Sequence, residues 1–195
     1  MKIGGFLESS LIDYPGKVAA VIFTVGCTFR CRYCHNPRLV YPELYGETVP
    51  LEKIMSLLER RRGILDGVVF CGGEPTMQED LPEVMRRVRS LGYLVKLDTN
   101  GAFPEKLAEA LPYADYVAMD IKAPFGPDYA RVCGGLSDDF EVRRSMLLLR
   151  SSGVEYHFRT TFHPDHLPVE RSGEIERFLG AGERYVIQHA SVVKK

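Results

Sequence analysis

The chain has 195 residues, of which 45% are apolar and 26% charged, with 25 Lys and Arg against 26 Asp and Glu. That length fits one domain, and the near-zero net charge excludes the broad basic surface of a typical nucleic-acid-binding protein. No apolar run is long enough to cross a membrane, and the first residues lack the layout of a signal peptide. The five cysteines are odd in number, which excludes a paired disulfide framework. We therefore expect a single cytoplasmic domain (1–195) that binds neither nucleic acid nor membrane.

Apolar runs rich in β-branched residues alternate with helical patterns along the chain. Six such runs predict strands at 18–24, 67–71, 93–97, 116–120, 156–162 and 185–188. Helices are predicted between them over 51–58 and 81–91, and again after Ser137 as the N-cap. The strands alternate little, which is typical of parallel strands buried on both faces. Six strand–helix units are fewer than the eight of a closed TIM barrel, so we predict an α/β fold, a partial (β/α)6 TIM-like barrel over 18–189, after a lead-in at 1–17.

Three cysteines lie within eight residues directly after the first predicted strand. Cys27, Cys31 and Cys34 form a C-x3-C-x2-C pattern, and their thiolates can converge on one metal centre. One interpretation is a zinc ion with His35 as fourth ligand, although adjacent Cys34 and His35 would have difficulty reaching the same ion. We favour an iron–sulfur cube, in which three thiolates leave one iron open to a small molecule.

Polar clusters follow the next strands, at the carboxyl ends where α/β folds place their chemistry. These clusters are Cys71-Gly72-Gly73-Glu74-Pro75, Leu97-Asp98-Thr99-Asn100-Gly101 and Met119-Asp120-Ile121-Lys122. Taken alone, they are consistent with glycine turns and an ordinary surface ion pair. The glycines also let a ligand approach the backbone, and Glu74 adds an anionic acceptor for a cation. Arg159, inside the fifth strand, faces either solvent or an anion within the barrel. Cys71 and Cys133, by contrast, are expected to be packing residues.

The C-x3-C-x-aromatic-C segment, together with Gly72-Gly73-Glu74, resembles the signature of radical S-adenosylmethionine (radical SAM) enzymes. The resemblance implies a barrel of the radical SAM type in which Cys27, Cys31 and Cys34 hold a [4Fe-4S] cluster. It further implies that the amino and carboxylate groups of SAM chelate the unique iron. Reduction of the cluster then cleaves SAM to a 5′-deoxyadenosyl radical, so that the cofactor supplies the chemistry while the protein binds and orients it.

The same resemblance assigns SAM contacts around the predicted barrel mouth. The GGE segment would receive the methionine ammonium of SAM, and Arg159 would receive its carboxylate. The residues carried over as SAM contacts are Asn36, Gly72, Gly73, Glu74, Thr99, Asn100, Asp120, Lys122, Arg159 and His189. For His189 an ordinary position on the rim is an equal alternative. Some members of the family also bind a monovalent cation here, which leaves open a cation at Asp98 and Asp120.

The stretch SLIDYPGK at 10–17, followed by FTVGC and CHNP, is similar to glycyl-radical-enzyme activating enzymes, in particular those of anaerobic ribonucleoside-triphosphate reductase and pyruvate formate-lyase. The similarity runs from Gly4 to Pro124 and more loosely to His189. It implies hydrogen abstraction from a glycine of a partner glycyl radical enzyme, with the anaerobic reductase as the expected partner. A low-potential donor such as flavodoxin or ferredoxin would supply electrons. The family often continues beyond 191–195, so we expect the partner or a further segment to cover the open barrel.

Two other functions stay open at this point. A radical SAM enzyme acting on a small molecule, as in deazapurine synthesis, shares the cluster and GGE motifs but gives no reason for the 10–17 stretch. A non-catalytic interaction module would instead use Cys27, Cys31, Cys34 and His35 to bind zinc. The resemblance favours neither of these two but an oxidoreductase of the radical SAM class that activates a glycyl radical enzyme.

Overall fold

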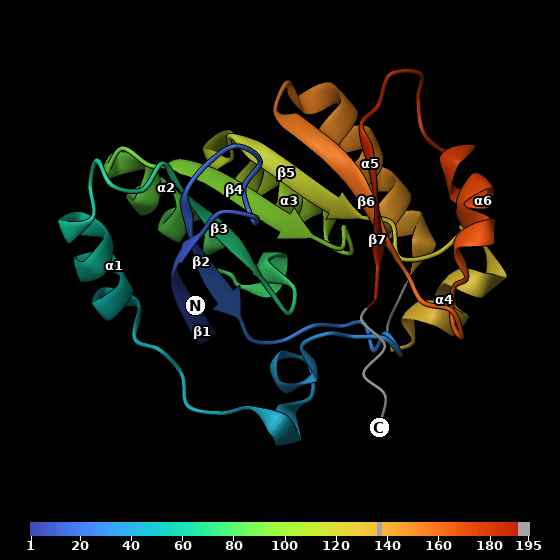
Figure 1. Cartoon of the computed structure of the whole chain (residues 1–195), viewed down its shortest axis with the longest axis horizontal. Helices are drawn as coiled ribbons and strands as arrows, with labels where there is room; N and C mark the ends of the chain where they lie inside the picture. Colours follow the sequence, from blue (N-terminus) through green and yellow to red (C-terminus); the bar gives the residue numbers. More distant parts are fainter. Residues whose placement is uncertain (136–137, 191–195) are drawn as a thin grey trace.

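The structure, a computed structural model, describes residues 1–135 and 138–190. Within these residues one seven-stranded sheet runs through the molecule in the order β1-β2-β3-β4-β5-β6-β7 (Figure 1). Its strands are β1 Ile3–Ser10, β2 Ala19–Thr24, β3 Gly67–Gly72, β4 Leu94–Thr99, β5 Tyr116–Asp120, β6 Glu155–Phe162 and β7 Tyr185–His189. Neighbours from β2 to β7 pair in parallel, which confirms the predicted parallel α/β sheet.

The strand β1 lies in the segment that the sequence predicted as a lead-in. It pairs antiparallel with β2, from Ile3 opposite Thr24 to Ser10 opposite Ala19. Its two consecutive glycines lower the strand propensity, which is why the pattern did not reveal it. A Cβ at Gly4 would approach the Leu39 side chain to 2.5 Å, so glycine leaves room there for Leu39. The sheet therefore carries one antiparallel edge strand on an otherwise parallel core.

Helices lie around the outside of the curved sheet (Figure 1). They are α1 Leu51–Arg60, α2 Leu81–Ser90, α3 Pro104–Ala110, α4 Pro127–Cys133, α5 Asp139–Ser152 and α6 Ser172–Glu176, with 3-10 turns η1 Pro37–Leu39, η2 Pro42–Leu44, η3 Pro75–Met77, η4 Leu111–Tyr113 and η5 Val169–Arg171. Asp138 caps α5 by accepting a hydrogen bond from the Phe140 N–H, whereas the predicted cap, Ser137, lies outside the described residues. In the described part of the chain, no helix has the length and apolarity required to cross a bilayer.

The two faces of the sheet pack differently because successive side chains of a strand point to opposite sides. Val68 and Phe70 of β3 join the large core beneath the helices, whereas Val69 points to the inner face. At the amino ends of the strands this inner face is filled by Tyr14, which follows β1 and whose ring centroid lies 5.9 Å from that of Tyr116. Tyr14 is thus packed into the barrel interior, and the polar carboxyl ends of the strands are left to surround a cavity.

Candidate active site

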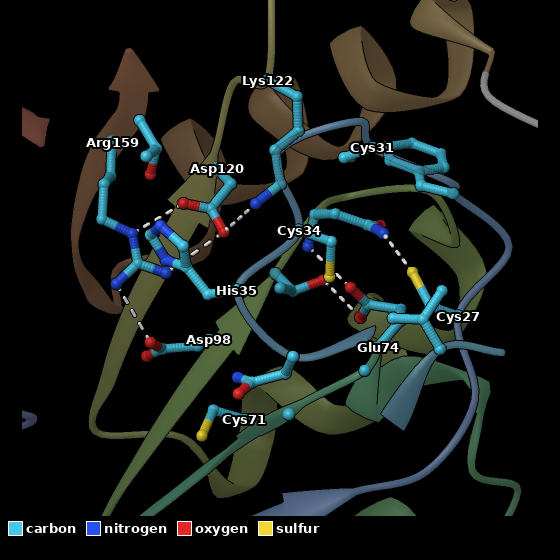
Figure 2. A pocket seen from close by; sticks show the side chains of 18 of the residues that line it. Cys27, Cys31, Cys34, His35, Cys71, Glu74, Asp98, Asp120, Lys122 and Arg159 are labelled. Carbon is cyan, nitrogen blue, oxygen red and sulfur yellow. Dashed lines mark hydrogen bonds and ion pairs between the residues drawn. The ribbon is translucent and has the colours of Figure 1, made fainter. Parts of the chain in front are cut away.

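A cavity of about 300 Å³ lies at the carboxyl ends of the parallel strands. The structure brings twelve of the thirteen residues predicted for the cluster and SAM to this cavity (Figure 2). They are Cys27, Cys31, Cys34, Asn36, Gly72, Gly73, Glu74, Thr99, Asn100, Asp120, Lys122 and Arg159. They come from the ends of β3 to β6 and from the loop after β2, as expected for a parallel α/β barrel.

His189 is the predicted residue that the structure places elsewhere. It ends β7 and lines a neighbouring cavity with His163 and Glu170, while Gln188 lines the main cavity. Adjacent residues of a strand point to opposite faces, so the two side chains cannot both turn inward. Gln188 accepts a hydrogen bond from the Thr161 hydroxyl at 3.2 Å. This placement does not support the predicted SAM contact of His189.

The cysteine loop is held in place by contacts that do not involve its thiols. The guanidinium of Arg30 donates to the carbonyls of Cys27 and Phe29, at 2.5 and 2.8 Å. The backbone N–H of Arg30 donates to the Cys133 carbonyl at 2.8 Å, and the Tyr33 hydroxyl donates to the Lys122 carbonyl at 2.8 Å. The loop is therefore anchored both to the end of α4 and to the strand end at β5.

Two glycines after α4 let the backbone approach this loop closely. Gly134 and Gly135 adopt φ angles of 57° and 62°, in the left-handed region that favours glycine. A Cβ on Gly134 would lie 2.9 Å from the Arg30 carbonyl oxygen, and one on Gly135 would collide with the Thr28 carbonyl oxygen. The shape of the cysteine loop therefore depends on glycine at both positions.

The cysteine thiols are largely enclosed by protein. Burial, with a contribution from the Glu74 charge, raises the pKa of Cys27 to about 12, and burial also raises the pKa of Cys34. The Nδ2 of Asn100 donates to the Cys27 sulfur at 3.6 Å. Such thiols become thiolates when a bound metal supplies positive charge. Among the described residues, no three His, Cys, Asp or Glu side chains are gathered closely enough to hold a single metal ion.

The remaining two cysteines have different surroundings. Cys133 is fully buried, as expected for a packing residue. Burial raises the pKa of Cys133 well above its ordinary value. Cys71 packs against the inner cluster that contains Tyr14, as predicted, but it is only partly buried and also lines the cavity. The reason is its position near the carboxyl end of β3, where the inward-facing side chains reach the open part of the barrel.

Glu74 links three strand ends through its buried carboxylate, which is 1% exposed. Its Oε1 accepts from the Thr76 N–H and hydroxyl at 3.1 and 2.5 Å and from the Thr99 hydroxyl at 2.7 Å. Its Oε2 accepts from the Asn100 N–H at 2.7 Å. The Glu74 N–H in turn donates to the Gly26 carbonyl at 2.7 Å. The carboxylate is thus engaged with protein donors, and it fixes the two residues that follow β4, although burial raises its pKa.

Five charged side chains of alternating sign form a chain at the cavity, of which four line it and are labelled in Figure 2. Lys96 pairs with Asp98, and Arg159 donates to Asp98 at 3.1 Å and to both oxygens of Asp120 at 2.6 and 3.1 Å. Lys122 donates to Asp120 at 2.8 Å. Burial alone would raise the pKa of Asp120, but the charges of Arg159 and Lys122 outweigh it and hold that pKa well below its usual value.

This chain of charges has three positive members and two negative ones, and the carboxylates of Asp13 and Glu74 line the same cavity. Arg159 points inward rather than to solvent, with 17% of its side chain exposed. Lys96 is a member that the sequence prediction missed. The available signal was its place in the apolar run YLVKL, two residues before Asp98 and therefore on the same face of β4.

Comparisons with known proteins agree with this architecture. A family model described as the radical SAM superfamily matches residues 21–179. A Methanocaldococcus jannaschii protein named for glycyl-radical enzyme activation is 35% identical over 193 residues, covering 95% of this chain and 78% of that protein. The pyruvate formate-lyase-activating enzyme of Clostridium pasteurianum is 33% identical over 138 residues, covering 68% of this chain and 57% of that enzyme. The 7-carboxy-7-deazaguanine synthase of Methanopyrus kandleri is 30% identical over 164 residues, covering 73% and 62%.

Solved structures share the fold at lower sequence identity. Streptococcus suis SuiB has a TM-score of 0.70 at 15% identity, covering 89% of this chain and 40% of SuiB. QueE from Escherichia coli has a TM-score of 0.54 at 14% identity, covering 96% and 93%. At these identities the likeness concerns the fold alone, whereas the family model and the M. jannaschii relative match most of the sequence. The chain therefore belongs to the radical SAM superfamily, among its glycyl-radical-enzyme activating members.

Proposed function

We propose that this chain uses a [4Fe-4S] cluster and SAM to abstract a hydrogen atom from a backbone glycine of a glycyl radical enzyme. The observation that carries the proposal is that the three loop cysteines share one cavity with the cationic side chains of Lys122 and Arg159. The anaerobic ribonucleoside-triphosphate reductase is the partner we expect, because the 10–17 stretch resembles its activating proteins. A low-potential carrier such as flavodoxin or ferredoxin would deliver the electron.

The donor set of the cavity fits a cluster. Cys27, Cys31 and Cys34 all line it, and each thiol has the soft sulfur that iron–sulfur clusters take as ligand. Asn100 donates to the Cys27 sulfur, a hydrogen bond of the kind that tunes such ligands. When bound, the cluster supplies the electron that cleaves SAM into methionine and the hydrogen-abstracting 5′-deoxyadenosyl radical.

The protein side chains would orient SAM by charge and shape. Lys122 and Arg159 would donate charge-assisted hydrogen bonds to the SAM carboxylate. Gly72 and Gly73 keep the backbone accessible at the end of β3 for the ammonium group. Glu74 would act indirectly, by holding residues that line the cavity, because its carboxylate already accepts hydrogen bonds from four protein donors. Tyr14 excludes water from the amino end of the barrel interior.

A radical SAM reaction on a small molecule is the second candidate, supported by the similarity to the M. kandleri 7-carboxy-7-deazaguanine synthase. The 10–17 stretch favours the first candidate. Within it, Tyr14 fills the inner face of the sheet and Asp13 lines the cavity, whereas Leu11 and Ile12 are exposed.

The deciding experiment is anaerobic reconstitution with iron and sulfide, reduction with dithionite, and incubation with SAM and a glycyl radical enzyme. We expect 5′-deoxyadenosine together with a glycyl-radical doublet in the EPR spectrum of the partner. Cys31→Ala should lose iron and both products, because two thiolates do not hold the cube. Cys133→Ala is the matched control and should keep its iron. Stoichiometric zinc without iron, or no SAM cleavage by the reduced protein, would contradict the proposal. Turnover of a small molecule, with no radical on any partner, would favour the second candidate.

A further inference from the structure

Lys96 is a buried lysine that the proposed function does not use. It lies in β4 with 3% of its side chain exposed, and its ammonium pairs with Asp98 inside the barrel. Lysine is rarely buried to this extent unless its charge is matched. Its neighbours across the sheet are the apolar Val69 of β3 and Tyr116 of β5, whose hydroxyl contacts His157 rather than Lys96. The role of Lys96 is therefore assigned to its charge, which pairs with Asp98, rather than to hydrophobic packing.

The reason for that charge is the pair of carboxylates above it. Asp98 and Asp120 lie on the neighbouring strands β4 and β5, and both line the cavity. Arg159 bridges them, binding Asp98 through Nη1 and Asp120 through Nε and Nη2. Two carboxylates facing one cavity attract a cation unless side chains neutralise both of them. One arginine carries one charge, so a second positive charge is needed for balance.

Two lysines supply further positive charge, one on each carboxylate. Lys122 binds Asp120 from the mouth of the cavity, at 2.8 Å, and lies where an anionic ligand reaches it. Lys96 binds Asp98 from below and does not line the cavity. Asp98 and Asp120 thus each have two cationic partners. A free cation placed between them would have to lie beside three positive side chains.

We propose that the Lys96 ammonium is a built-in counter-ion for Asp98, which takes the place of a free monovalent cation at the two carboxylates and makes ligand binding in this cavity independent of such an ion. The cation left open by the sequence at Asp98 and Asp120 is then not a cofactor of this chain. Lys96 is a positioning residue, because neutralising Asp98 leaves Arg159 held by Asp120 and directed at the ligand. The inference rests on the proposed function only in taking SAM as that ligand.

The test compares salts of equal ionic strength: potassium chloride, sodium chloride and choline chloride. For the reconstituted wild-type protein we expect the same SAM affinity within twofold and the same unfolding temperature in all three. Lys96→Met should bind SAM about tenfold more weakly in choline chloride, the loss expected for one charge-assisted contact. Potassium or sodium should restore most of that loss and raise the unfolding temperature, because the small ion can enter beside Asp98. A merely structural lysine would show no such cation-specific rescue.

Three further variants sharpen the comparison. Lys96→Arg keeps the charge and should stay indifferent to the salt. Lys96→Met combined with Asp98→Asn removes both charges and should lose the cation response of the single variant. Lys53→Met removes an exposed lysine of α1 and serves as the matched control without effect.

The proposal is overturned if wild-type SAM affinity falls about tenfold in choline chloride, or if Lys96→Met binds SAM like the wild type in every salt. Should Lys96→Met fail to fold, the wild-type comparison decides by itself. The unfolding temperatures are measured without SAM, so they test Lys96 even if SAM does not bind. Failure of the proposed function would instead appear as absent 5′-deoxyadenosine in all salts.

Discussion

At the scale of single residues, Glu74 combines deep burial with a fully hydrogen-bonded carboxylate. Its carboxylate accepts from four donors on Thr76, Thr99 and Asn100. Glu74→Gln replaces one accepting oxygen by an amide that itself donates, so one buried donor faces another. We expect a loss of about 1–3 kcal/mol in the free energy of unfolding, together with weaker SAM binding.

The iron content of Glu74→Gln should stay unchanged, because no cysteine is removed. Denaturant unfolding, SAM binding and iron analysis on the same sample check the three outcomes. Unchanged SAM affinity in the variant would contradict the role assigned to Glu74 in holding the residues after β4.

His157 predicts a specific pH dependence of stability. It lies on β6, 6% exposed, with its Nδ1 within 2.8 Å of the Tyr116 hydroxyl. Burial, together with the charges of Arg159 and Lys96, lowers its pKa from 6.5 to about 4. The unfolded chain therefore binds a proton between these two pH values that the folded chain does not, so stability falls as the pH drops from 6.5 to 4.

Over that window the wild type should lose roughly 3 kcal/mol more than His157→Gln. Urea unfolding at several pH values measures the difference. His166→Gln, which changes a half-buried histidine in the segment after β6, should follow the wild-type curve. Parallel curves for wild type and His157→Gln would show that His157 does not titrate as described.

The sequence revealed most of the residues around the cavity because they follow strand ends in recognisable clusters. It did not reveal what these side chains bind. Glu74 was expected to accept a ligand cation, yet its oxygens face protein donors from the end of another strand. Lys96 was overlooked inside an apolar run. Whether Gln188 or His189 faces the cavity depends on how β7 is oriented in the sheet. Such contacts are set by residues far apart in the chain, which a local pattern does not contain.

At the scale of elements, the turn after β3 depends on glycine. A Cβ on Gly73 would collide with the carbonyl oxygen of Gly26, which also accepts the Glu74 N–H. Because the obstacle is backbone, the two strand ends must move apart. We expect Gly73→Ala to lower the free energy of unfolding by about 2 kcal/mol and to weaken SAM binding.

Gly46→Ala is the matched control for this turn, since a Cβ there meets open space. It should change stability by less than about 0.5 kcal/mol. Denaturant unfolding of both variants makes the comparison, and equal stabilities would show that the loop after β2 adapts to the extra methyl group.

The parallel strands were predictable at this scale because each is a short apolar run between turn residues. The antiparallel β1 was not, since Gly4 and Gly5 weaken the local signal and its pairing partner β2 is settled only in the folded sheet. Ser137 was predicted to cap a helix, and the described cap of α5 is Asp138. Residues of similar capping ability stand side by side there, and the sequence alone does not choose between them.

At the scale of the whole molecule, the alternation of strands and helices predicted the partial barrel correctly. What the sequence did not show is how the barrel interior is divided. Tyr14 fills the amino end, and five alternating charges occupy the carboxyl end. The packing of Tyr14 and the chain of charges bring together residues of the 10–17 stretch, β4, β5 and β6. These residues meet only after the sheet has curved. The functional cavity is thus a product of the entire fold.

The anchoring of the cysteine loop has a consequence for survival in air. Arg30 and Tyr33 bind backbone carbonyls, and the glycines after α4 clasp the loop, all without using a thiol. If oxygen destroys a cluster held there, these contacts persist, and the emptied loop keeps the outline into which a new cluster can be inserted. If the proposed function is correct, oxidative damage would remove the iron and sulfide of the cluster and leave the folded polypeptide intact.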